Sequence, residues 1–537
     1  MELTRQCLTH LAEVTDGCSY EVIVVDNAST DGTKEFLSTL GGDIQVISNP
    51  DNYGFAKGCN QGAAAAKGRF LVFLNNDTIP KPGWLRALMD EVQQHSDVAI
   101  VGSKLLYPDD TIQHAGVVFS KNCLTPYHLF RGASGDLPAT NVRQEFQVVT
   151  AACMLIRREE FDAVGGFDEI YRNGFEDVDL CLKVGKRGKK VIYQPKSVLY
   201  HLEHQTPGRK DPESERRNGK VLMDRWATSI VVDEDLYTVP AGYANRYYFR
   251  DGWLRQSLEP FQSDVERSQW KRVQRVQELL LRQRSDTAKT LNGPKDAELH
   301  DLLSEDREWP EDVEVLRWGA KLCQSLQLLN GERSFWKRTL SLGENREARE
   351  RLATLALTMK DLGEGTQHIQ ALLQSDPNDG SGHWLQGILM MQSQQCAEAV
   401  RAFREALHCG ADSRKAGLGL GMACMGMGNH EEAWRVFDQI MIAHPDDSDA
   451  MNGLIQAGTA LEQWEDLRQR LSRYVERNPA DCDRRFALAG IEFRAGRLDS
   501  AKRQFEMLSL LKPDFEGLHD LGVLLQTTLL DRHALAT

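Results

Sequence analysis

The chain has 537 residues, of which 41% are hydrophobic and 26% charged, an ordinary globular composition with room for roughly two to four domains. The net charge of −14 and the absence of a Lys/Arg run argue against a nucleic-acid-binding surface. Eleven irregularly spaced cysteines with no Cys-x-x-Cys pair predict reduced core thiols. No apolar run approaches the ~18 residues that cross a bilayer, and no signal-peptide core opens the chain, so we expect a soluble cytoplasmic protein.

The first part of the chain alternates apolar strands with helices. The expected elements are, in order, helix 3–14, strand 20–25, helix 34–40, strand 44–48, helix 61–67 and strand 70–74. This βαβαβ order, with strands rich in Val, Ile and Phe, predicts a mostly parallel sheet with right-handed crossovers.

Strand 70–74 organises this part of the chain. Its five consecutive apolar residues are too few for a buried helix and typical of a central strand. The strand ends at Asn75-Asn76-Asp77, so a carboxylate stands where open α/β sheets bind ligands. Oxygen ligands there suit a hard divalent cation that bridges substrate phosphates. An Asx turn that only closes the strand explains the same residues.

A second polar strand end follows strand 20–25 at Asp26 and Asn27. Residues 29–31, Ser-Thr-Asp, provide an N-cap for the next helix. The segment lacks the glycine pattern of dinucleotide folds and the Gly-Lys-Ser/Thr of P-loops. Together with Asp77, this strand end indicates a nucleotide-binding site. One loop would hold the base or ribose, and a metal on the loop with Asp77 would hold the diphosphate.

Glu176 and Asp177 begin a segment in which Val178, Cys181 and Leu182 have helical spacing. Negative charge is stabilised at a helix N-terminus, and capping of an amphipathic helix explains the pair. The alternative is catalytic, because a carboxylate that is held ionised can accept a proton from a nucleophile.

Six segments follow one another in a fixed order. They read Glu21-Val-Ile-Val-Val-Asp-Asn-Ala-Ser-Thr-Asp-Gly, Asn52-Tyr-Gly-Phe-Ala-Lys-Gly-Cys-Asn60, Phe73-Leu-Asn-Asn-Asp-Thr78, Thr150-Ala-Ala-Cys-Met-Leu-Ile-Arg157, Gly165-Gly-Phe-Asp-Glu169 and Phe175-Glu-Asp-Val-Asp-Leu-Cys-Leu182. Together they resemble family 2 glycosyltransferases of the GT-A fold. The resemblance fades after Arg225-Trp226, and it specifies the family without specifying a sugar.

The resemblance implies a role for each polar strand end. Asp26 and Asn27 would face the nucleoside. Asn75-Asn76-Asp77 would be the Asp-x-Asp element, in which Asn replaces the first carboxylate. Asp77 would then be the ligand of Mn²⁺ or Mg²⁺, with Asn75 and Asn76 as support.

The resemblance also implies that Asp177 is the base of an inverting displacement, with Glu176 supporting its loop. It places His201 on the metal side, whereas His204 falls where a small residue is commoner. A polar surface loop explains both histidines equally, and zinc is not expected because no cysteine or third histidine lies close in sequence. Thr150 begins an apolar segment that lines the acceptor side or is simply a buried strand.

One feature departs from the family. Its members usually begin with an apolar strand that contributes to the nucleotide pocket, but this sequence starts at Met1 inside the first helix. Either the chain was defined from an internal start, or the sheet lacks a central strand. The second case would leave the backbone groups of two neighbouring strands unpaired and predicts a loss of activity.

The remainder of the chain divides by composition and period. We expect the GT-A domain over residues 1–206, its C-terminal extension over 207–250, a helical connector over 251–345 and a repeat array over 346–537. The charge of the connector is interpreted as a solvated face.

The array follows a 34-residue period. Positions that coincide on this grid are Pro377, Pro445, Pro479 and Pro513 with Ala411 in the missing slot, Gly387 and Gly421, Ala399, Ala433 and Ala501, and Phe403, Phe437 and Phe505. These are the marks of tetratricopeptide repeats, about five with a partial last one, of which the run 448–481 is degenerate. Such repeats form a right-handed solenoid whose concave face binds peptides or proteins, and a plain helical spacer is the alternative.

The sequence therefore predicts an α/β GT-A domain followed by an all-α connector and an α-solenoid. The leading functional hypothesis is a metal-dependent inverting glycosyltransferase that moves a sugar from a nucleotide donor to an acceptor hydroxyl. The acceptor would be a polysaccharide, a lipid-linked glycan or a protein, and the repeats would recruit the acceptor or a protein partner. The rival hypothesis is a non-catalytic repeat scaffold that carries a truncated, inactive transferase domain.

Overall fold

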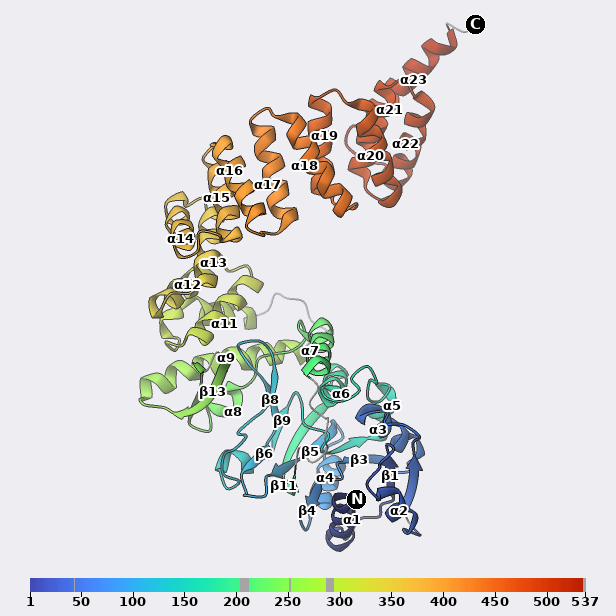
Figure 1. Ribbon diagram of the computed structural model, residues 1–537, viewed down its shortest axis with the longest axis vertical. Coiled ribbons are helices and arrows are strands. Elements are labelled where there is room, and N and C mark those ends of the chain that lie inside the picture. Colours follow the sequence, from blue (N-terminus) through green and yellow to red (C-terminus); the bar gives the residue numbers. More distant parts are fainter. Residues whose placement is uncertain (43, 203–211, 251–252, 286–293, 535–537) are drawn as a thin grey trace. The chain divides into compact units, whose positions relative to one another are not determined.

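The computed structural model describes the chain except for residues 43, 203–211, 251–252, 286–293 and 535–537 (Figure 1). The chain forms two compact units, Met1–Gly331 and Glu332–Thr537. The division falls inside the stretch 251–345, where the sequence predicts a connector. Within the described residues, no helix has both the length and the apolar character needed to cross a bilayer.

The first unit combines strands and helices. Its strands are β1 (Val22–Asp26), β2 (Ile44–Ser48), β3 (Phe70–Leu74), β4 (Thr78–Pro80), β5 (Val98–Leu106), β6 (Ile112–His114), β7 (Val117–Phe119), β8 (Pro126–His128), β9 (Gln144–Phe146), β10 (Cys153–Arg157), β11 (Lys190–His201), β12 (Tyr243–Arg250) and β13 (Trp253–Pro260). Its α-helices are α1 (Glu2–Val14), α2 (Thr33–Ser38), α3 (Phe55–Ala65), α4 (Trp84–Gln94), α5 (Arg158–Ala163), α6 (Glu176–Lys186), α7 (Pro212–Trp226), α8 (Asp235–Thr238), α9 (Asp264–Ser285), α10 (Pro294–Ser304) and α11 (Val313–Ser325). Short 3₁₀ helices cover Pro138–Asn141 and Asp306–Glu308, and α12 (Leu329–Leu342) spans the boundary between the units.

A seven-stranded sheet forms the centre of the first unit. Its main path runs β3-β10-β5-β11-β4, with β6 paired to β5 and β9 paired to β11. Every residue of β5 is buried, because β10 and β11 flank it and apolar clusters cover both faces. On one face Val101 and Leu88 of α4 belong to one apolar cluster, and on the other face Met154 and Leu180 of α6 belong to a second.

The sheet is mixed, whereas the sequence predicts a mostly parallel one. β1 pairs with β2 in parallel and β5 with β11 in parallel, but β10 runs antiparallel to both β3 and β5. The reason lies in residues 107–152, which depart from the βαβ order. Their short strands β6 and β9 pair antiparallel with β5 and β11, and β7 pairs with β8, before the chain continues as β10.

The strands β1 and β3 lie in different sheets. Among the described residues, β1 pairs only with β2, and β3 pairs only with β10 at the end of the larger sheet. A sheet that lacks a central strand is one of the two cases that the sequence leaves open. Helix α1 packs nearby, and its Leu11 and Val14 join the apolar cluster that includes Phe70 and Val72 of β3.

A hairpin stands at the start of the region where the sequence predicts helices. Strand β13 pairs antiparallel with β12 in continuous register from Tyr243↔Pro260 onward. Aromatic residues Tyr247, Tyr248 and Phe249 favour a strand over a helix, and the pairing partner that stabilises it cannot be read from local periodicity.

A buried ion cluster holds the segment that precedes this hairpin. Nζ of Lys121 lies 2.7 Å from a carboxylate oxygen of Glu234 and 2.7 Å from one of Asp235, and all three side chains are fully buried. Burial raises the pKa of Asp235 to about 6, against the lowering effect of Lys121. Since removal of one partner of such a pair costs about 3–5 kcal/mol, the cluster fixes α8 against the loop after β7.

The second unit is built of paired helices. They are α13 (Arg346–Thr358), α14 (Leu362–Ser375), α15 (Gly380–Gln392), α16 (Cys396–His408), α17 (Ser413–Gly426), α18 (His430–Ala443), α19 (Ser448–Ala460), α20 (Trp464–Arg477), α21 (Cys482–Arg494), α22 (Leu498–Leu511) and α23 (Leu518–Ala534). Figure 1 shows α13–α22 as successive helix hairpins, whose starts recur with the period of the sequence grid. The predicted tetratricopeptide repeats are therefore confirmed.

Glycines of two helices, one in the same repeat and one in the next, pack against each of the grid residues Phe403 and Phe437. A Cβ atom added at Gly421 or Gly453 would lie 2.5 Å from the ring of Phe437, and Gly387 and Gly419 stand in the same relation to Phe403. Glycine therefore lets two helices close around each aromatic ring.

A second periodic feature caps the first helix of each pair. The side chains that accept a backbone N–H at these helix starts are Asn345, Asp379, Asp412, Asp447 and Asp481. Such caps stabilise a helix by about 1 kcal/mol each. The proline grid predicts the helix ends but not these caps.

Candidate functional site

The turn after β3 carries the first set of candidate residues. Asp77 is buried, with 7% of its surface exposed, and its backbone oxygen accepts a hydrogen bond from the N–H of Leu202, 2.9 Å away. The backbone oxygen of Asn75 accepts the hydroxyl of Thr78, 2.7 Å away. Because the turn is held at both ends, the Asp77 carboxylate has a fixed position between β3 and β4.

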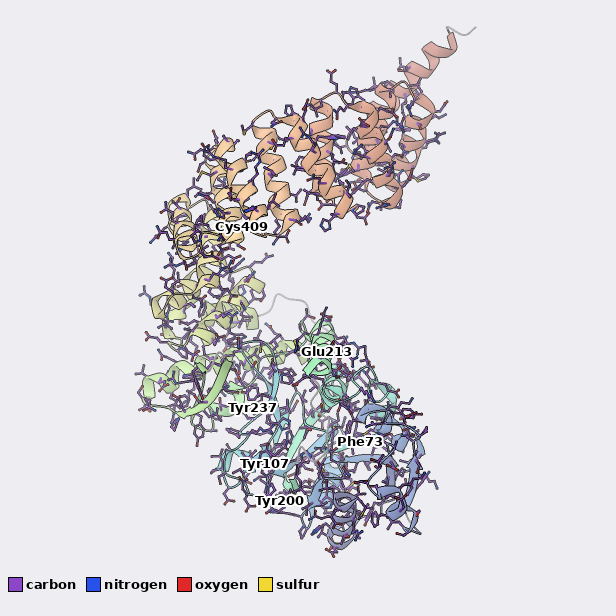
Figure 2. All side chains as sticks on the ribbon, in the orientation of Figure 1. Phe73, Tyr107, Tyr200, Glu213, Tyr237 and Cys409 are labelled. Atoms are coloured by element: carbon purple, nitrogen blue, oxygen red, sulfur yellow. The ribbon has the colours of Figure 1, made fainter. Side chains whose placement is uncertain are left out.

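His201 lies beside this turn as the last residue of β11. Its Nε2 is 3.2 Å from Oδ1 of Asp77 and 3.4 Å from Nδ2 of Asn75, and only 4% of the residue is exposed. Among the described residues, Nδ1 of His201 has no hydrogen-bond partner. β11 pairs with β4 in the register His201↔Thr78, which brings the two distant segments together. Figure 2 labels Tyr200, the neighbour of His201 in β11, and Phe73 of β3, the strand that leads into the Asp77 turn. His204 lies outside the described residues.

Asn76 faces away from this pair. Its Nδ2 donates a hydrogen bond to the hydroxyl of Thr4, 2.9 Å away, and so connects the turn to helix α1. Asn76 therefore supports the turn from the α1 side, while Asn75 contacts His201.

The donor set can be tested against a divalent cation. Asp77 supplies a carboxylate and His201 an imidazole, the ligand types that Mn²⁺ accepts, while Mg²⁺ favours the carboxylate. No group of three or more His, Cys, Asp or Glu side chains gathers into a metal site in the part of the chain that the structure describes. The residues therefore fit a cation that takes its other ligands from a bound diphosphate and water.

The end of β1 carries the second set. Oδ1 of the buried Asp26 accepts the N–H of Ser29, 3.0 Å away, which folds the loop back over the strand end. Nδ2 of Asn27 donates to the backbone oxygen of Gly54, 3.0 Å away, in the glycine-punctuated loop before α3.

Two further amides extend this contact. Nδ2 of Asn49 donates to Oδ1 of Asn27 at 2.7 Å, and Asn49 exchanges hydrogen bonds of 2.7 and 2.9 Å with Gln61. The orientation of Asn27 is thus set by a chain of amide groups. Sequence reasoning missed Asn49 and Gln61, because single polar residues in a loop and on a helix carry no periodic signal.

Asp177 stands in the first turn of α6. Its Oδ2 accepts the N–H of Ala151 at 3.1 Å and the hydroxyl of Thr150 at 3.2 Å, and its Oδ1 accepts the N–H of Val178 at 2.9 Å. These three donors fix the orientation of the Asp177 carboxylate at the start of α6. Asp177 remains partly exposed, whereas its neighbour Glu176 is buried.

Residues 151–152 connect the Asp77 turn with Asp177. The N–H of Ala151 binds Asp177, and the backbone oxygen of Ala152 accepts the N–H of Asn75 at 2.9 Å. The candidate base and the Asp77 turn are therefore both hydrogen-bonded to residues that lead into β10. Thr150, predicted on the acceptor side, belongs to this segment.

Comparison with known proteins identifies the N-terminal region. Residues 2–164 match the family model described as glycosyl transferase family 2. An uncharacterised protein, y4gI, of Sinorhizobium fredii is 35% identical over 40% of this chain and 25% of its own length. The O-antigen biosynthesis protein RfbC of Myxococcus xanthus is 33% identical over 38% of this chain and 16% of its own length. The chain thus spans a quarter or less of these two relatives.

Shorter relatives and solved structures are more distant. The N-acetylglucosaminyl-diphospho-decaprenol L-rhamnosyltransferase of Mycobacterium tuberculosis is 27% identical over 36% of this chain and 69% of its own length. A structure of GalNAc-T7 with UDP, GalNAc and Mn²⁺ covers 43% of this chain and 46% of its own, at 15% identity and a TM-score of 0.34. The pilus biogenesis factor PilW covers 40% of this chain and 98% of its own, at 18% identity and a TM-score of 0.34.

Proposed function

Because its N-terminal part is a family 2 glycosyltransferase domain, we propose that the chain is a metal-dependent, inverting glycosyltransferase. It moves a sugar from a nucleotide-sugar donor to an acceptor hydroxyl. The observation that carries the proposal is the shared attachment of Asp177 and the Asp77 turn to residues 151–152, since one enzyme site needs its base and its diphosphate site at a fixed separation.

The donor is held at two strand ends in this proposal. Asp26 and Asn27 contact the nucleoside, with Asn27 oriented by its amide neighbours. Asp77 and His201 hold Mn²⁺ or Mg²⁺, which would offset the negative charge that develops on the leaving diphosphate. The burial of both side chains strengthens their electrostatic interaction with a bound charge.

Asp177 acts on the acceptor. Its carboxylate takes the proton of the acceptor hydroxyl as the oxygen forms a bond to the anomeric carbon. The bond from that carbon to the diphosphate oxygen breaks on the opposite face, so the configuration inverts and the nucleoside diphosphate leaves. The N–H groups of Ala151 and Val178 hold the carboxylate in a fixed orientation for this role.

The donor sugar and the acceptor are proposed by chemical class. A relative named as a rhamnosyltransferase supports a hexose or deoxyhexose donor. The acceptor is a polysaccharide, a lipid-linked glycan or a protein. The helix-pair array in the second unit supports recruitment of that acceptor or of a protein partner. All eleven cysteines are free thiols, which supports a reducing compartment such as the cytoplasm.

A hydrolysis and transfer screen over nucleotide sugars, with Mn²⁺, Mg²⁺ or EDTA, tests the proposal. We expect one donor to be consumed only with a divalent cation, and the product anomer to be inverted when a soluble sugar acceptor is present. A product that retains the donor configuration would contradict the inverting mechanism.

One observation favours the rival hypothesis of a non-catalytic scaffold. The nucleoside residues follow β1, whose sheet is separate from the one that carries Asp77 and Asp177 in the described residues. If no nucleotide sugar is bound or consumed while the repeats still bind a protein partner, the scaffold hypothesis replaces the enzyme.

A further inference from the structure

Residues 166–175, here called the bridging loop, lie between α5 and α6 and end directly before α6. Asn60 of α3 contacts the beginning of this loop through both atoms of its amide. Its Oδ1 accepts the N–H of Phe167 at 3.0 Å, and its Nδ2 donates to the oxygen of Phe167 at 2.9 Å. The ring of Phe167 packs against that of Phe73 in β3, with centroids 4.8 Å apart. The loop is thus anchored at its first turn.

The far end of the bridging loop contacts the segment that leads into α3, whose first residue is Phe55. The N–H of Phe55 lies 2.9 Å from both the backbone oxygen of Arg172 and Oδ1 of Asn173. The guanidinium of Arg172 donates to the backbone oxygen of Asn52 at 2.6 Å. A Cβ at Gly54 would lie 2.5 Å from Arg172, so this close approach requires glycine.

The same segment is contacted from the nucleoside side. Asn27 donates to the backbone oxygen of Gly54, and the next residue, Phe55, donates to the bridging loop. The Gly54–Phe55 peptide therefore lies between a candidate nucleoside residue and Asn173. A contact path of one peptide unit therefore joins Asn27 to Asn173.

The loop then leads directly to the candidate base. Gly174 and Phe175 have φ values of 87° and 73°, and α6 begins at the next residue. A left-handed conformation at a residue other than glycine costs about 1–2 kcal/mol, so surrounding contacts must hold it. Nδ2 of the buried Asn218 in α7 supplies two of them, to the backbone oxygens of Asn173 at 2.9 Å and Gly174 at 3.2 Å.

We propose that Asn173 and Arg172 are positioning residues that couple the nucleoside loop to the general base. Their contacts with the Asn52–Phe55 segment hold the strained turn at Phe175 and so set the direction in which Asp177 faces the acceptor. Neither residue touches the reacting atoms. The inference rests on the proposed function for its catalytic consequence, but the mechanical link from Phe55 to α6 stands on the contacts alone.

Matched substitutions separate this role from simple folding. Asn173→Ala removes the side-chain acceptor of the Phe55 N–H and leaves only the backbone oxygen of Arg172, whereas Asn173→Asp keeps a side-chain oxygen there. Asn173 is exposed, so neither change opens the core. Arg187→Ala is the control, because Arg187 is a half-exposed arginine at the far end of α6 whose ion pair is with Glu160, 2.9 Å away.

The first measurement is steady-state transfer with the donor found in the nucleotide-sugar screen. Asn173→Ala should lower kcat about 10-fold or more with the donor Kd changed less than about 2-fold, Asn173→Asp should recover most of kcat, and Arg187→Ala should match the wild type. Equal losses in Asn173→Ala and Asn173→Asp, or none in either, would overturn the positioning role.

The second measurement does not depend on turnover. Hydrogen exchange of the amides in residues 174–179 is compared among the same variants, with and without UDP and Mn²⁺. Faster exchange in Asn173→Ala but not in Asn173→Asp supports the link even if the wild type transfers no sugar, in which case only the proposed function fails. Unchanged exchange in Asn173→Ala refutes the link.

Discussion

Nε2 of His201 lies 3.2 Å from Oδ1 of Asp77, although one residue ends β11 and the other follows β3. The pair forms because β4 starts one residue after Asp77 and pairs with the end of β11. Both side chains are buried at a sheet edge, and under the proposed function they would hold the cation together.

Asp77→Ala should make donor binding insensitive to Mn²⁺ and weaken it by about tenfold or more, equivalent to ~1.4 kcal/mol. Asn75→Ala is the matched control, because it shortens a side chain at the same turn without removing a carboxylate. Its effect should be much smaller. Calorimetric titration of the donor with Mn²⁺ and with EDTA measures both. Identical wild-type affinities in the two conditions would rule out a metal role for Asp77.

Asp177→Asn should abolish transfer and leave donor affinity nearly intact, because the base acts on the acceptor. Loss of a general base typically costs ~10²–10⁴-fold in rate. The amide keeps one oxygen for the N–H of Ala151 or Val178, so the helix start is expected to stay folded. Asp162→Asn, at an exposed carboxylate of α5, is the control. Transfer at the wild-type rate in Asp177→Asn would remove Asp177 from the mechanism.

The sequence predicts the strand ends and the helix start that carry these residues, because apolar periodicity and polar turns are local signals. It does not predict the amide chain from Asn27 through Asn49 to Gln61, since each link joins residues with no shared periodicity. The contact of Asn60 with Phe167 is missed for the same reason.

Strand pairing sets a further limit on sequence reasoning. The place of β10 between β3 and β5, and the pairing of β12 with β13, depend on partners that local patterns do not identify. The repeat array is the opposite case. Gly387 and Gly421 recur at the repeat period, as do Phe403 and Phe437, so the sequence predicts most of the array.

His114 should make the first unit sensitive to mild acid. It is fully buried with no hydrogen-bond partner at either ring nitrogen among the described residues, and its ring centroid lies 4.9 Å from that of His128. Burial, together with the nearby His128 and His201, holds the pKa of His114 well below its usual value. The unfolded chain therefore binds a proton below pH ~6.5 that the folded chain does not, so stability is present above that pH and falls below it by roughly 1.4 kcal/mol per unit.

The acid sensitivity of each variant is measured as its change in Tm between pH 7.5 and pH 5. His114→Phe should show a smaller acid-induced loss than the wild type, because the proton-binding difference is gone. His10→Gln, at a partly exposed histidine of α1, should behave like the wild type. An acid-induced loss in His114→Phe as large as that of the wild type would contradict the assignment.

Gly421→Ala should destabilise the repeats by about 1–3 kcal/mol, because the new Cβ would lie 2.5 Å from the ring of Phe437. Gly490→Ala provides the matched control in α21, where a Cβ meets no atom within 4 Å. That change should instead stabilise the helix by about 0.5–1 kcal/mol. Urea unfolding followed by circular dichroism measures both, and shifts of the midpoint in the same direction would contradict the packing argument.

Recruitment of the acceptor by the repeats is tested by ending the chain at Gly343, which keeps α12 whole and removes α13–α23. Repeats contact mainly their neighbours, so we expect the transferase domain to stay folded and to keep donor hydrolysis. For a large acceptor that the full chain glycosylates, KM should rise with kcat nearly unchanged, because docking far from the chemistry contributes equally to the ground and transition states. A small soluble acceptor, which does not reach the array, should be used as before. Steady-state kinetics on both acceptors decide the question, and an unchanged KM for the large acceptor would mean that the array serves as a spacer.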